Sequence, residues 1–140
     1  MDVQIDWLGV ALATVAAMVI GSLWYSKWLL GPMWQKLVGI KDDQMKMQSA
    51  PAILTAVVLS LLTAYVLNHL IFLAHTFYDY SWIQSGISTA FWVWLGIAFP
   101  FQWMNGMFEN RSRRLVTLNL ANQLVTLLAM GAIIGYFLNN

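Results

Sequence analysis

The chain contains no cysteine and few charged residues, and each shortage excludes a class of protein. Without cysteine there is no disulfide framework, no thiol chemistry and no thiolate metal site. Only 9% of the 140 residues are charged, whereas a typical soluble domain has about 25%. A soluble fold of this length could not bury the 60% of residues that are hydrophobic. We therefore expect lipid to surround most of the chain.

Motifs for common chemistries are also missing. The two histidines lie far from any cluster of carboxylates, so we expect no metal and no cofactor. The sequence holds no Ser-His-Asp set, glycine-rich phosphate loop or HExxH helix. A net charge of +1 gives no reason to expect nucleic acid as a partner. These absences favour a non-catalytic protein and leave an enzyme as an open alternative.

Four long apolar stretches predict one all-α domain, a polytopic bundle of four transmembrane helices. They cover residues 7–30, 51–75, 82–104 and 112–137. Each exceeds the roughly 20 residues that span the hydrocarbon core of a bilayer. None has a charged residue in its central turns. The first stretch follows Asp2 and Asp6 with no basic residue before it, which predicts a retained helix rather than a cleaved signal.

The connection over residues 31–50 is predicted to contain a short interfacial helix. Pro32 suits a first helical turn, and Gly39 would end the helix. Between them Met33, Trp34, Leu37 and Val38 share one face. The alternative is a solvated loop with its aromatic side chains among the lipid headgroups.

The basic residues predict the orientation in the membrane. With four spans, all of them fall on one side: Lys27, Lys36, Lys41, Lys46, Arg111, Arg113 and Arg114. Lysine and arginine accumulate in cytoplasmic loops, so both termini are expected outside the cytoplasm. Glu109 precedes three of these arginines, which predicts a salt bridge within the loop and lipid phosphates near the arginines.

Small residues at helical spacing predict close packing between helices. Ala13, Ala17 and Gly21 follow one another in steps of four, as do Gly131 and Gly135. Such patterns let two backbones approach each other in lipid. They fit packing within one chain or between copies, and we expect a homo-oligomer.

The fourth stretch carries a polar cluster in the middle of the membrane. Asn119, Asn122, Gln123 and Thr126 fall within about 100° of the helix surface. Amides at this depth are costly unless they find partners. They therefore form hydrogen bonds between helices, or they line a site for a small ligand.

The third stretch offers a partner surface for that cluster. Ser85, Ser88, Thr89, Trp92 and Gly96 form one stripe at helical spacing. The indole N–H of Trp92 needs an acceptor, and an amide oxygen of Asn119, Asn122 or Gln123 is the predicted one. Pro100 is expected to kink this helix, because it lacks an N–H and crowds the preceding turn.

His69 is the candidate titratable group. It lies near the outer end of the second stretch. A proton-relay or ligand role is one interpretation, and a histidine at the lipid–water interface is the other.

Several motifs together resemble a known family. In the first half they are Gly21-Ser-Leu-Trp-Tyr-Ser26, Trp34 and Gly39. In the second half they are Trp94-Leu-Gly-Ile-Ala-Phe-Pro100, Phe108-Glu-Asn-Arg111, Asn119, and Leu124 through Met130-Gly-Ala-Ile-Ile-Gly135. The set is similar to the small bacterial membrane proteins of the DUF1761 family, a domain of unknown function. Lys27 stands where that family often has proline. The resemblance implies a four-helix protein of the bacterial inner (plasma) membrane and supplies no activity.

Three functions remain open. The first is the binding or passage of a small neutral or amphipathic molecule through the polar cluster. The second is a non-catalytic accessory or scaffold protein that docks partner proteins. The third is a membrane enzyme that acts on a lipid or quinone-like substrate with His69 in a role. Ion-coupled pumps and proton relays usually need a charge in the middle of the membrane, and its absence ranks the first two above the third.

Overall fold

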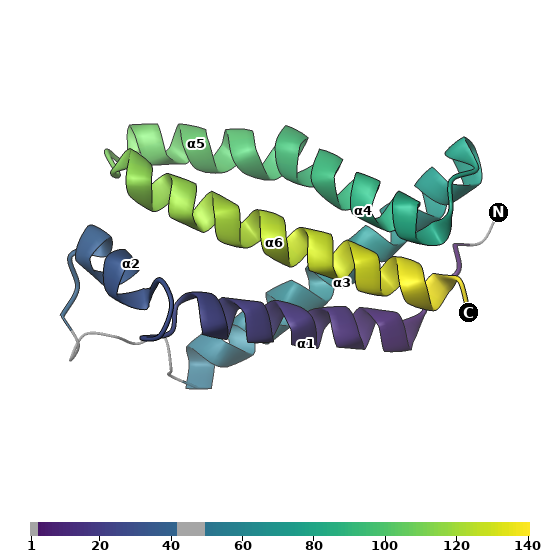
Figure 1. The fold of residues 1–140 in the computed structure, drawn as a ribbon, viewed down its shortest axis with the longest axis horizontal. Helices are drawn as coiled ribbons and strands as arrows, with labels where there is room; N and C mark the ends of the chain where they lie inside the picture. The colour runs from purple at the N-terminus through teal and green to yellow at the C-terminus, as the bar shows by residue number, and fades with distance from the viewer. Residues whose placement is uncertain (1–2, 42–49) are drawn as a thin grey trace.

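The computed structural model describes residues 3–41 and 50–140, and every regular element within them is helical (Figure 1). The elements are α1 (Trp7–Trp24), α2 (Gly31–Val38), α3 (Ala50–Tyr78), α4 (Trp82–Val93), the π-helical turn η3 (Trp94–Ala98), α5 (Phe99–Phe108) and α6 (Arg113–Leu138). The predicted all-α class is confirmed for this part of the chain.

Three helices, α1, α3 and α6, are long and apolar enough to cross a membrane. The third predicted stretch is a succession of α4, η3 and α5 without a break over residues 82–108. Polar side chains begin three of the helices. Asp6 accepts a hydrogen bond from the backbone N–H of Gly9, Ser81 from that of Gln84, and Ser112 from that of Leu115. These caps supply acceptors for N–H groups that a helix start leaves unpaired.

The first helix ends six residues earlier than predicted, and a compact turn follows it. The backbone N–H of Leu30 donates to the carbonyl of Trp24, and that of Gly31 donates to the carbonyl of Ser26. A side chain at Gly31 would overlap the carbonyl groups of Tyr25 and Ser26. The turn therefore requires glycine, and α2 starts directly after it. The predicted short helix is confirmed, and Gly39 ends it with φ +77°.

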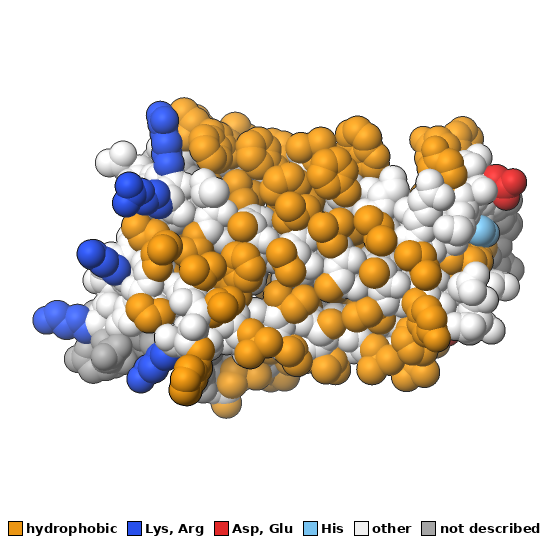
Figure 2. Space-filling model, viewed as in Figure 1, with side chains coloured by type: hydrophobic (Ala, Val, Ile, Leu, Met, Phe, Trp, Pro, Cys, Tyr) orange, Lys and Arg blue, Asp and Glu red, His pale blue; other side chains and the backbone are white. Residues whose placement is uncertain are grey.

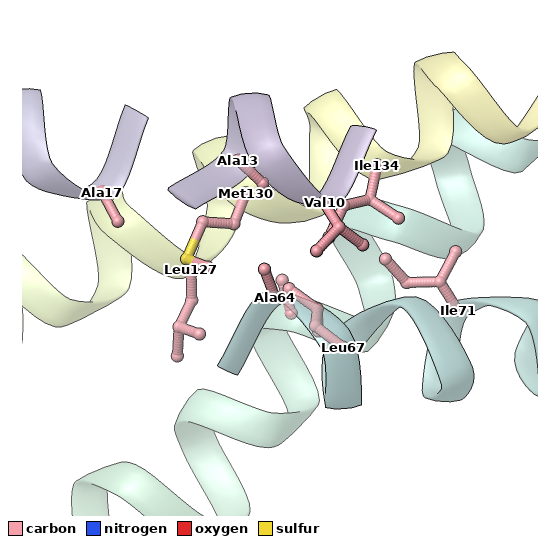
Figure 3. Packing of buried hydrophobic residues seen from close by; sticks show 10 residues of the cluster. Val10, Ala13, Ala17, Ala64, Leu67, Ile71, Leu127, Met130 and Ile134 are labelled. Atoms are coloured by element: carbon pink, nitrogen blue, oxygen red, sulfur yellow. The ribbon is translucent and has the colours of Figure 1, made fainter. Parts of the chain in front are cut away.

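Helix α6 runs through the middle of the molecule, between α1 and the α4–α5 segment, and α3 crosses behind them (Figure 1). The core lies where these helices meet (Figure 3). Its residues include Val10, Ala13 and Ala17 of α1, Ala64, Leu67 and Ile71 of α3, and Leu127, Met130 and Ile134 of α6. Only 11% of the most apolar window of α3 is buried, so this helix presents most of its side chains outward.

Charged side chains gather at the two ends and leave an apolar belt between them (Figure 2). The end of α1, helix α2 and the α5–α6 turn lie together, and with them lie the described basic residues (Figures 1 and 2). We call this the basic end and define it by the described basic residues Lys27, Lys36, Lys41, Arg111, Arg113 and Arg114. Lys46 lies outside the described residues. Asp79 lies at the opposite end, in the short turn between α3 and α4.

Candidate ligand-binding groove

Glycine residues hold α4 directly against α6 in the half of the molecule away from the basic end. A methyl group added at Gly86 or at Gly131 would overlap the backbone carbonyl of the other residue. One added at Gly135 would overlap the carbonyl of Trp82. We call these three glycines the glycine contact. Gly131 and Gly135 of the predicted packing pattern therefore pack inside the protomer.

The small-residue pattern of α1 is displaced by one turn from the predicted set. Ala13 and Ala17 are buried in the core. A methyl group at Gly21 would meet no atom within 4 Å, whereas one at Gly9 would lie 2.9 Å from Cβ of Phe137. The close approach of α1 to α6 thus uses Gly9, Ala13 and Ala17, and Gly21 takes no part in it.

One stripe of residues faces α6 along the length of α4, η3 and α5. It comprises Gly86, Ala90, Trp94, Gln102 and Gly106, all separated by multiples of four residues. Each step of four overshoots a full α-helical turn by about 40°, so the stripe would drift off α6 on a straight helix. The wider turn of η3, closed by a bond from the Phe99 N–H to the Trp94 carbonyl, absorbs part of that drift. The wide turn ends two residues before Pro100, the residue at which a kink was predicted.

Trp92 does not face α6, contrary to the sequence prediction. Its side chain is 64% exposed. Two residues after the buried Ala90, it lies about 200° around the helix, on the outward side. The tryptophan that reaches α6 is Trp94, whose Nε1–H donates to the backbone carbonyl of Leu120 at 3.0 Å.

Two members of the predicted polar cluster are hydrogen-bonded to other helices. The hydroxyl of Tyr25 donates to Oδ1 of Asn119 at 2.9 Å. Nε2 of Gln102 donates to Oε1 of Gln123 at 2.7 Å. Asn119 thus joins the end of α1 to α6, while Gln123 joins α5 to α6. Both pairs lie in the half of α6 nearer the basic end, about 9–15 Å along the helix from its start.

The rest of the cluster presents buried polar atoms without partners. Among the described residues, four side-chain atoms are shielded from solvent and make no hydrogen bond: Nδ2 of Asn122 and Oγ1 of Thr126 in the cluster, Nε1 of Trp24 on α1 and Oγ of Ser85 on α4. A buried donor without an acceptor destabilises a fold by roughly 1–3 kcal/mol. Unpaired groups beside paired amides indicate hydrogen-bonding capacity that this chain leaves unused.

A polar cavity of about 220 Å³ opens between α5 and α6 at the level of Asn119. It is lined by Gln102, Asn105, Gly106, Glu109, Arg111, Val116 and Asn119, and we call it the amide groove. Glu109 and Arg111 form an ion pair at 2.5 Å, as the sequence predicted, so the two formal charges in the lining offset each other. The lining is therefore neutral and rich in amide donors and acceptors.

A second cavity, of about 240 Å³, adjoins the amide groove at Gly106, Arg111 and Val116. Its other lining residues are Trp103, Met107, Asn110 and Arg113, and we call it the arginine cavity. The two helices that form both cavities touch at Gly106, where an added methyl group would overlap the side chain of Val116.

The remaining predicted site residues lie away from the amide groove. Ser88 and Thr89 are half-buried on α4. His69 lies on α3, near the end away from the basic end, with Nδ1 2.9 Å from the carbonyl oxygen of Tyr65 in the preceding turn. The ring of His69 also contacts that of Tyr65 edge to face. The structure therefore separates His69 from the polar cluster of α6.

Sequence reasoning missed Tyr25, Gln102 and Asn105 as members of this site. Gln102 carried a usable signal, because it is an amide within the apolar third stretch. Tyr25 did not, because an aromatic residue at a helix end is also the usual membrane-interface pattern.

The model of the family described as "Protein of unknown function (DUF1761)" matches residues 8–135, which is most of the chain. No curated protein and no solved structure matches the chain. The chain belongs to the DUF1761 family, as its sequence resemblance predicted.

Proposed function

We propose that this member of the DUF1761 family is a four-span membrane protein that binds or passes a small neutral or amphipathic molecule at the amide groove. The observation that carries the proposal is the neutral, amide-rich lining of this cavity. Asn122, whose buried Nδ2 has no partner, lies about one helical turn from the lining residue Asn119. Cavities of about 300–1,000 Å³ take drug-sized ligands. A volume of about 220 Å³ therefore favours a smaller molecule.

The fourth span in this proposal is the continuous α4–η3–α5 segment. Its 27 residues, 82–108, contain no charged side chain. At about 1.5 Å per residue they extend roughly 40 Å, more than the hydrocarbon core of a bilayer requires. Together with α1, α3 and α6 this segment completes four crossings.

The proposed location is the bacterial inner membrane, with the basic end in the cytoplasm. The described lysines and arginines at one end support this orientation under the positive-inside rule. The amide groove then opens towards the cytoplasmic side. A homo-oligomer remains part of the proposal, since the outward faces of the long helices carry large apolar side chains that lipid or a second copy would cover.

A scaffold role has less support from the geometry. Gly131 and Gly135, whose pattern fitted packing between copies as well as within one chain, already contact α4 in the same chain. The enzyme alternative depends on His69, which lies against Tyr65 on α3, away from the polar cluster of α6. We therefore keep ligand binding as the proposal.

The test is native mass spectrometry of the protein purified in a mild detergent. We expect a reproducible non-lipid mass to remain bound to the wild type. A variant with Asn119, Asn122 and Gln123 all changed to leucine should lose it. Gln84→Leu is the matched control, because this exposed amide lies in the first turn of α4 and does not line the amide groove, and it should retain the mass. Retention by the triple variant would overturn the proposal.

A further inference from the structure

The arginine cavity brings two guanidinium groups together with apolar side chains. Arg111 and Arg113 line it along with Trp103 and Met107. Arg111 is shared with Glu109. Among the described residues, Arg113 has no carboxylate partner. The cavity therefore has an excess of positive charge, unlike the neutral amide groove beside it.

This charge favours an anionic group with several acceptor oxygens. Arginine presents five N–H donors in a planar fork that matches phosphate and carboxylate oxygens. Asn110 adds a polar side chain to the same lining. A phosphate group fits this donor set better than a neutral solute does.

The apolar part of the lining indicates that the phosphate belongs to a lipid. Met107 is 71% exposed on the outward surface of α5. Trp103 lies one turn before it in the helix, and tryptophan is enriched where acyl chains meet headgroups. An acyl chain can follow these side chains along α5 while its phosphate lies at the arginines.

We propose that the arginine cavity binds the headgroup phosphate of an anionic phospholipid from the surrounding bilayer. Arg113 supplies the unshared charge, and Arg111 donates from the side of its guanidinium that Glu109 leaves free. Basic pockets at the cytoplasmic edge of membrane helices bind anionic headgroups in this manner. The inference rests on the chain spanning a membrane and is independent of what the amide groove binds.

The test measures lipid retention by native mass spectrometry, with dioleoyl phosphatidylglycerol and dioleoyl phosphatidylcholine added separately to delipidated protein. Wild type should retain phosphatidylglycerol preferentially. Arg113→Gln should weaken that retention about tenfold, the effect of losing one charge-assisted hydrogen bond. Arg114→Gln is the matched control, because it removes the same charge one residue further on, at a side chain that lines neither cavity.

Three results would overturn the proposal. Equal losses in the two variants would mean that general surface charge, not the cavity, attracts the lipid. Equal retention of the two lipids by wild type would remove the anionic preference. Displacement of phosphatidylglycerol by millimolar glycerol 3-phosphate would assign the cavity to soluble phosphate esters. We expect no such displacement, because a soluble ester lacks the acyl chain that contacts Trp103 and Met107.

Discussion

The hydrogen bond from Tyr25 to Asn119 links the end of α1 to α6 beside the amide groove. The bond is partly buried and joins two polar side chains that lie 94 residues apart in the sequence. Sequence reasoning predicted that Asn119 needed a partner, because a buried amide is costly unless it is paired. It could not identify Tyr25, since that choice depends on how α1 and α6 lie against each other.

Tyr25→Phe should lower the free energy of unfolding by about 1 kcal/mol, because it removes the donor and leaves Oδ1 of Asn119 without this bond. Reversible denaturation in mixed micelles would measure the change. Tyr136→Phe is the control, since Tyr136 is exposed near the end of α6, and it should have little effect. Equal losses would show that the Tyr25 hydrogen bond adds nothing to stability.

Gly86→Ala should destabilise the protein by about 1–3 kcal/mol, the usual range for overpacking a close contact. The added methyl group would face backbone atoms of Gly131 and Gly135, and backbone cannot rotate away. Gly21→Ala should be neutral or stabilising by up to about 1 kcal/mol, because alanine is the better helix former and the space there is open. The same denaturation measurement applies, and similar losses in both variants would contradict the glycine contact.

At the scale of the element, η3 determines which face α5 presents to α6. Helical spacing over residues 82–104 selected the face that carries Ser88, Thr89 and Trp92, with a kink expected only at Pro100. The α4 face that touches α6 is instead set by Gly86 and Ala90, which are small enough for close approach. The sequence predicted that this helix exists and that it bends at Pro100. A wider turn is not visible in periodicity, so Trp94 and Gln102 could not be placed.

Insertion of one alanine after Ile97, an exposed residue within η3, should rotate α5 by about 100°, because the wide turn already holds about one residue more than an α-helical turn. Gln102 would then leave Gln123. Deletion of Ile97 should instead convert the wide turn to α-helix and leave α5 in its orientation, which makes it the matched control. Because the chain has no native cysteine, a Gln102→Cys, Gln123→Cys pair gives an unambiguous readout with a short thiol-reactive cross-linker. We expect cross-linking in the full-length and deletion backgrounds and a large decrease in the insertion variant. Undiminished cross-linking in the insertion variant would show that η3 does not set the orientation of α5.

For the molecule as a whole, the distribution of charge and hydropathy along the sequence predicted the architecture better than individual polar residues predicted the site. The helical class, the short helix after the first long one and the collection of described basic residues at one end follow from composition and spacing alone. The site was predicted only in part. The site residues of α6 share one helical face and could therefore be predicted from the sequence. Their partners on α1 and α5 could not, because those contacts depend on how the turns between the helices fold.

Both ends of the chain should lie outside the cytoplasm. The described termini emerge at the end opposite the basic residues (Figures 1 and 2). A periplasm-specific enzymatic reporter fused after Asn140 should be active in a bacterial host, and a cytoplasm-specific reporter at the same position should be silent. The opposite pattern would invert the proposed topology and place the amide groove at the outer surface.

The glycine contact closes the path from the amide groove to the opposite end of the molecule between α4 and α6. In the half away from the basic end, the backbones of α4 and α6 touch, whereas the amide groove opens in the other half. A solute bound there as proposed could not continue between α4 and α6 to the opposite end of the molecule unless those backbones separate. Occupancy would then follow the concentration on one side of the membrane alone, as in a sensor or a reservoir, and net flux would require the glycine contact to open.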